Sequence, residues 1–142
     1  MHNALPPPNS PQPRSASVAN GNAKSVLVVE DDVDLRRIIV KALGKSYNVY
    51  EACDGADALL ALDGAQAPDL IVSDVMMPKL DGFAMARQLK AHPTMSKIPI
   101  VFLTARDAAM DVVEGINAGA RQYVTKPFKV NELVARVTKL LG

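Results

Sequence analysis

Short apolar runs recur along this chain, separated by segments that favour helices or turns. The runs are nearly continuous, as expected of strands that are covered on both faces. They predict strands over residues 25–29, 48–52, 69–73, 98–103 and 122–125. This feature restricts the chain to a layered α/β fold in which a sheet lies between helices.

Helices are predicted between and after these strands, because apolar residues there recur at helical spacing. Asp32 and Asp81 stand where their side chains can cap the first helical N–H groups, and Asp54-Gly55 opens another helix. The predicted helices cover approximately residues 33–44, 55–64, 82–92 and 107–118, and a last helix carries the apolar residues of 133–141. Strands and helices that alternate with short connections predict a doubly wound parallel sheet with helices on both faces. The periodicity does not give the strand order.

Polar residues stand at the carboxyl ends of four of the predicted strands. Glu30 and Asp31 follow the first strand, Asp74 the third, Thr104 the fourth and Lys126 the fifth. Because parallel strands end at one edge of a sheet, these side chains are expected to converge there. Two or three carboxylates would bind a hard divalent cation, and the hydroxyl and ammonium could hold a phosphoryl group.

The composition of the chain argues against several classes of function. The chain has 142 residues, 49% of them apolar, which fits one domain with a tail. It has no apolar run of membrane-spanning length, no apparent secretory signal and one cysteine, so we expect a cytoplasmic protein without membrane contact. A net charge of +1 without a long basic run argues against direct nucleic-acid binding. Cys53 is interpreted as a packing residue and His92 as a surface residue.

Residues 1–23 differ in composition from the remainder of the chain. They contain five prolines mixed with Asn, Ser, Gln and Gly, and they have too little apolar surface to offset the entropy of ordering. We expect a disordered tail at 1–23 and one domain at 24–142. The alternative of a proline-rich docking segment for a partner stays open.

Residues 24–141 resemble the receiver domain of bacterial two-component response regulators, of the chemotaxis-regulator-like type. The resemblance rests on four motifs that occur in order across the domain. They are Val26-Leu-Val-Val-Glu-Asp-Asp32, Ser73-Asp-Val-Met-Met-Pro78 with Asp81-Gly82, Phe102-Leu-Thr-Ala105 and Tyr123-Val-Thr-Lys-Pro-Phe128. It implies a flavodoxin-like, five-stranded parallel sheet in the order 2-1-3-4-5.

The resemblance also implies roles for individual residues. Asp74 matches the phosphoacceptor, a carboxylate nucleophile that becomes an acyl phosphate. Thr104 matches the switch hydroxyl, which bonds a phosphoryl oxygen. Lys126 matches the lysine that stabilises developing negative charge, and a cis Lys126-Pro127 bond is implied.

Mg²⁺ is the cofactor that the resemblance implies. Glu30, Asp31 and Asp74 match the acidic residues that hold it, and the backbone carbonyl of Met76 would supply a further oxygen. Asp31 and Asp74 are expected to be direct ligands, whereas Glu30 can act through water. Asp32 is interpreted as a helix cap only.

Further positions match residues that modulate signalling in this family. Tyr123 matches the aromatic switch residue, although a half-buried packing role is the alternative. Met76 and Arg106 occupy positions that tune the lifetime of the acyl phosphate, although a solvated surface role is the alternative for Arg106. Arg121-Gln122 departs from the family pattern, since acidic residues often precede the final strand, and this change affects the choice of partner.

The resemblance implies a phosphorylation-controlled switch. A sensor histidine kinase or a histidine phosphotransfer protein would supply the phosphoryl group. A downstream protein would then bind the face made by the helix at 107–118, the strand at 122–125 and the last helix. The domain would catalyse only its own phosphorylation and dephosphorylation, so it is not expected to be a turnover enzyme.

Two other functions are compatible with parts of this pattern. An aspartate-nucleophile phosphatase usually has a second acid two residues after the nucleophile, where this chain has Met76. A receiver-like interaction module that needs no phosphate would not require the complete set of acids, hydroxyl and lysine. Whether the chain acts alone or belongs to a larger protein stays open.

Overall fold

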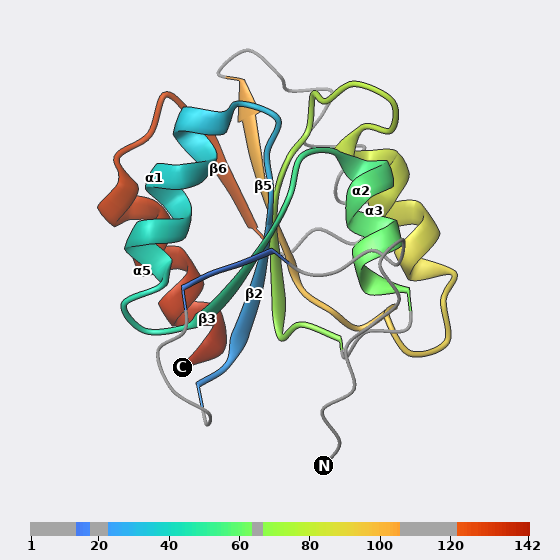
Figure 1. Ribbon diagram of the computed structural model, residues 1–142, viewed down its shortest axis with the longest axis horizontal. Coiled ribbons are helices and arrows are strands. Elements are labelled where there is room, and N and C mark those ends of the chain that lie inside the picture. Colours follow the sequence, from blue (N-terminus) through green and yellow to red (C-terminus); the bar gives the residue numbers. More distant parts are fainter. Residues whose placement is uncertain (1–13, 18–22, 64–66, 106–121) are drawn as a thin grey trace.

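The computed structural model describes residues 14–17, 23–63, 67–105 and 122–142. Its helices and strands alternate along most of the chain (Figure 1). In chain order they are β1 (Arg14–Ser17), β2 (Ser25–Val29), α1 (Val33–Leu43), β3 (Asn48–Ala52), α2 (Gly55–Leu62), β4 (Leu70–Asp74), α3 (Gly82–Lys90), β5 (Ile100–Ala105), β6 (Gln122–Lys126) and α5 (Val130–Leu141). The helix expected at 107–118 lies outside the described residues.

The sheet has the order β1-β3-β2-β4-β5-β6. In the part of the sheet from β3 to β6, all neighbouring strands are parallel. If these five strands are numbered in chain order from β2, their order is 2-1-3-4-5, which confirms the predicted core. Helices α1 and α5 cover one face of the sheet, and α2 and α3 cover the other (Figure 1). None of the helices in the described segments combines the length and apolar character needed to cross a bilayer.

Two apolar cores form because successive strand residues point to opposite faces of the sheet. In β2, Val26 and Val28 belong to the core under α1 and α5, whereas Leu27 and Val29 belong to the core under α2 and α3. Both sets are buried, which explains why the sequence of this strand is continuously apolar rather than alternating.

Aspartate side chains start three of the helices, as the sequence predicts for Asp32 and Asp81. Asp32 Oδ1 accepts a hydrogen bond from Leu35 N at 3.1 Å, and Asp81 Oδ1 accepts one from Ala84 N at 2.8 Å. Asp54 Oδ1 accepts the corresponding N–H of α2 at 2.8 Å. These caps fix the points where the chain turns from the sheet edge into each helix.

Three of the predicted strands have slightly different bounds in the structure. The fourth ends at Ala105 rather than at residue 103, so it includes Thr104, and the fifth ends at Lys126 rather than at residue 125. The strand expected at 98–103 begins instead at Ile100, after Pro99, which has no N–H to donate to the sheet. The strand expected at 69–73 is Leu70–Asp74, so Asp74 is itself the last strand residue. This shift fixes the backbone of Asp74 in the sheet.

Residues 14–17 depart from the disorder expected of the N-terminal tail. They form β1, which is antiparallel to β3, with Arg14 opposite Glu51. This stretch contains no proline, so its backbone can pair with the edge of β3, which would otherwise present unpaired N–H and C=O groups. The domain boundary at residue 24 stays a prediction.

Candidate functional site

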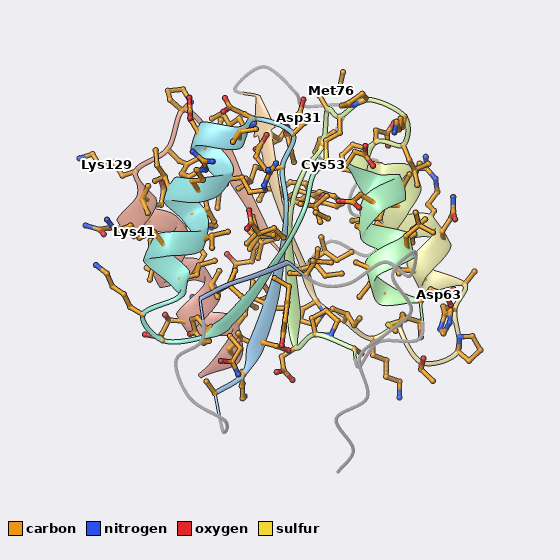
Figure 2. The ribbon with its side chains drawn as sticks, in the orientation of Figure 1. Asp31, Lys41, Cys53, Asp63, Met76 and Lys129 are labelled. Atoms are coloured by element: carbon orange, nitrogen blue, oxygen red, sulfur yellow. The ribbon has the colours of Figure 1, made fainter. Side chains whose placement is uncertain are left out.

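The predicted acids meet at the carboxyl edge of the sheet. Strands β2 and β4 are parallel neighbours with Val29 opposite Ser73, so Glu30 and Asp31 emerge beside Asp74. One carboxylate oxygen from each of these three acids lies within 4.8 Å of the others. Asp31 lies at this end of the sheet, as does Met76 (Figure 2). Glu30 and Asp74 are buried and Asp31 is exposed, so the cluster opens to solvent on one side.

Lys126, the last residue of β6, reaches the same cluster. Its Nζ lies 3.1 Å from Asp74 Oδ2 and 3.3 Å from Glu30 Oε1. The Lys126-Pro127 peptide bond is cis, as the family resemblance implies. The ammonium therefore bridges the acid that follows β2 and the acid that ends β4.

Thr104 supplies a hydroxyl beside the acids. Leu103 of β5 is opposite Asp74 of β4, so Thr104 lies one residue beyond the register partner of Asp74. The side chain of Thr104 is buried, and its Oγ1 has no hydrogen-bond partner among the described residues. A buried hydroxyl usually has a partner, so this one is suited to a bound oxygen-rich group.

Glycine at position 82 allows α3 to pack closely against the acceptor strand. Gly82 N donates to Val75 O at 2.9 Å, and a Cβ atom at this position would collide with the carbonyl oxygen of Asp74. The same Cβ would also press on the ring of Phe102. The Asp81-Gly82 motif does not indicate this role in the sequence, whereas in the structure the absence of a Cβ atom lets Gly82 lie against the backbone of Asp74.

The electrostatics of the cluster are dominated by burial. Burial raises the pKa of Glu30 to about 7, although the N–H of Asp32 and the ammonium of Lys126 act in the opposite direction. Burial also raises the pKa of Asp74, against the effect of Lys126. Burial lowers the pKa of Lys126, but its ion pairs with the two acids outweigh this effect and raise it. The pKa values of acids and base thus shift upward for different reasons: burial raises those of the two acids, and two ion pairs raise that of the lysine.

The donor set fits the proposed ligands. Three carboxylates supply the hard oxygen ligands that Mg²⁺ prefers, and Asp31 leaves one side accessible to water, which Mg²⁺ usually retains. A divalent cation would also stabilise the charged forms of Glu30 and Asp74, whose pKa values burial raises. The hydroxyl of Thr104 and the ammonium of Lys126 are both donors, which suits them to phosphoryl oxygens.

The other predicted site residues are Met76, Tyr123 and Arg106. The side chain of Met76 is 71% exposed. Tyr123 is half-buried and stacks on Phe102, with 6.1 Å between the ring centroids. Arg106 lies outside the described residues.

One residue that contacts the cluster was missed in the sequence. Arg36 Nη1 donates a hydrogen bond to the backbone oxygen of Glu30 at 2.7 Å. Its Nε also forms an ion pair with Glu51 Oε1 at 2.9 Å. No local sequence motif indicates these two contacts, because they join α1 to the end of β2 and to β3.

Comparisons with known proteins agree with the fold and indicate the family. The profile of the response regulator receiver domain matches residues 26–138. The response regulator MprA of Mycolicibacterium vanbaalenii is 44% identical over 117 residues, which cover 82% of this chain and 49% of that relative. A crystal structure of a putative response regulator from Chloroflexus aurantiacus is 32% identical with a TM-score of 0.75, covering 84% of this chain and 98% of that one.

A second solved structure is informative about the metal. It is the receiver domain of the sensor histidine kinase PA1611 from Pseudomonas aeruginosa, with a magnesium ion coordinated in its active site cleft. It is 30% identical with a TM-score of 0.72, covering 84% of this chain and 98% of that one.

The chain therefore belongs to the response regulator receiver domain family of two-component signalling. It spans about half the length of the curated relatives that it matches.

Proposed function

We propose that this receiver domain accepts a phosphoryl group on Asp74, with Mg²⁺ as cofactor, from a sensor histidine kinase or a histidine phosphotransfer protein. The observation that carries the proposal is the surroundings of the Asp74 carboxylate. An ammonium lies 3.1 Å away, two further acids lie beside it, and the buried hydroxyl of Thr104 lies on the neighbouring strand. A carboxylate that only capped a helix would not need this set.

The reaction is a phosphoryl transfer between a nitrogen and an oxygen. A carboxylate oxygen of Asp74 bonds to phosphorus while the bond from phosphorus to the donor's imidazole nitrogen breaks, and that nitrogen keeps the electron pair. Lys126 exchanges its contact with Asp74 for a phosphoryl oxygen, and Thr104 donates to another. Asp31, Asp74 and the Met76 carbonyl would hold Mg²⁺, and Glu30 would hold it directly or through water. The bound ion would supply positive charge at the phosphoryl oxygens. Attack by water later releases inorganic phosphate and restores the carboxylate.

Phosphorylation is proposed to act as a switch rather than as part of a turnover cycle. Movement of Thr104 towards a phosphoryl oxygen changes the packing space available to Tyr123. This shift biases a pre-existing equilibrium between two conformations of the face that includes β6 and α5. The segment at 107–118, which the family resemblance assigns to the same face, lies outside the described residues. That face would bind the downstream protein.

Two positions are proposed to set the lifetime of the acyl phosphate. The exposed Met76 lies two residues after the acceptor, where its side chain can limit the access of water. Arg106 is assigned the same role from its place two residues after Thr104. The protein is proposed to work in the cytoplasm through protein partners, without contacting nucleic acid or membrane itself.

Labelling with acetyl phosphate tests the proposal. Intact-mass measurement should show one added phosphoryl group in the wild-type chain with Mg²⁺, and none with EDTA or in Asp74→Asn. Asp69→Asn is the matched control, because Asp69 directly precedes the opposite end of β4, where its Oδ2 accepts a hydrogen bond from Ser25 N. Full labelling of Asp74→Asn would contradict the proposal.

A further inference from the structure

Arg36 connects three elements beside the acid cluster. It lies in the first turns of α1, and its guanidinium contacts the residue that follows β2 and a residue of β3. The side chains of Arg36 and Glu51 are 13% and 18% exposed, so their ion pair is largely shielded from solvent and salt. The planar guanidinium fixes both contacts in one orientation, which a lysine ammonium on its flexible stem would not do.

The contact with Glu30 is made to the backbone. The accepting oxygen belongs to the peptide group that joins Glu30 to Asp31, and a peptide group is planar. Holding that oxygen therefore sets the direction in which the chain leaves β2 and the position from which the Asp31 side chain extends. Two other hydrogen bonds secure the same region: Glu30 N donates to Ala52 O at 3.1 Å, and Asp32 N donates to Glu30 Oε2 at 3.1 Å.

Glu51 determines where the guanidinium lies. It is opposite Val28 in the register of β2 and β3, close to the strand ends. By accepting from Nε at 2.9 Å, its carboxylate leaves Nη1 directed at Glu30. Glu51 also offsets the positive charge of Arg36, which by itself would oppose the binding of a cation nearby.

We infer that Arg36, braced by Glu51, is a positioning residue that fixes the Glu30–Asp31 peptide and thereby sets the affinity of the acid cluster for Mg²⁺. This inference rests on the proposed function of the cluster. Geometry and charge make opposite predictions for Arg36: if it acts by position, its loss weakens Mg²⁺ binding, whereas if it acts only by charge, its loss strengthens binding.

The test is calorimetric Mg²⁺ titration of the wild-type chain, Arg36→Lys, Arg36→Gln and Glu51→Gln. Arg36→Lys keeps the charge but loses the two-point contact. Groups that orient metal ligands typically change affinity by one to two orders of magnitude, so we expect roughly tenfold weaker binding in both Arg36 variants. Glu51→Gln should weaken binding less, because Nη1 can still reach Glu30. Arg37→Lys is the control, since Arg37 is the exposed neighbour on the same helix.

A second readout separates positioning from a general loss of stability. Amide hydrogen exchange in metal-free protein should be faster at Asp32, whose N–H binds Glu30, in Arg36→Lys than in the wild type. Exchange in the β4 and β5 core should be unchanged. Unchanged Mg²⁺ affinity in Arg36→Lys, or tighter binding in Arg36→Gln, would overturn the inference. A wild-type chain that binds no Mg²⁺ would instead overturn the proposed function.

Discussion

Replacing Glu30 by glutamine should change how the stability of the metal-free domain depends on pH. The side chain of Glu30 is 1% exposed, and burial raises its pKa from 4.5 to about 7. The folded state therefore binds a proton at Glu30 more tightly than the unfolded state does. The associated stability is fully present below pH 4.5 and is lost as the pH rises to about 7, where the folded state also releases the proton.

The shift gives the size of the effect. One pKa unit corresponds to about 1.4 kcal/mol, so the wild-type domain should lose about 3 kcal/mol of unfolding free energy across this interval. Glutamine resembles the protonated acid and does not titrate. Glu30→Gln should therefore be similar in stability to the wild type near pH 4.5, and more stable by up to about 3 kcal/mol near pH 8.

The assay is urea unfolding in EDTA across this pH range, followed by circular dichroism. Any fixed cost of placing an amide beside Lys126 is the same at every pH. The informative quantity is therefore how the difference in unfolding free energy between Glu30→Gln and the wild type changes with pH. Glu132→Gln controls for the chemical change, because Glu132 is an exposed residue of α5. If the difference between Glu30→Gln and the wild type varies by less than about 1 kcal/mol, burial does not hold a proton on Glu30.

Four further predictions concern neighbouring residues. Asp31→Ala should lower Mg²⁺ affinity at least about tenfold in calorimetry, and an unchanged titration would remove Asp31 from the ligand set. Lys126→Ala should slow acetyl phosphate labelling about a hundredfold while Mg²⁺ still binds, so a wild-type rate would contradict its role. Thr104→Val should keep or raise unfolding stability by about 1 kcal/mol, since it removes a hydroxyl that has no partner among the described residues; a loss of stability would reveal a partner. Gly82→Ala should destabilise the fold by roughly 1–3 kcal/mol in urea, and wild-type stability would show that α3 can shift away from Asp74.

Much of the fold could be predicted because its signals are local. The strand segments appear as short apolar runs, and Asp32 and Asp81 indicate where the helices that they cap begin. Convergence of Asp74 and Lys126 followed from one further rule, that parallel strands end at the same sheet edge. The family resemblance then supplied the strand order.

Other features depend on contacts that leave no local pattern. The strand at Arg14–Ser17 is polar and lies in a proline-rich segment, and it pairs only because the edge of β3 is available. Arg36 and Glu51 are fifteen positions apart and meet only after α1 packs against the sheet. The raised pKa of Glu30 likewise depends on complete burial, which an acid at a strand end does not reveal in sequence.

The most direct test of the central claim is to locate the phosphoryl group chemically. The wild-type chain would be treated with acetyl phosphate and Mg²⁺ and reduced with borohydride, which converts an aspartyl phosphate into homoserine, and its peptides would then be mapped by mass spectrometry. Homoserine is expected at position 74, and none is expected when EDTA replaces Mg²⁺. Homoserine at another acid, or a phosphoryl group that survives reduction on a different side chain, would contradict it.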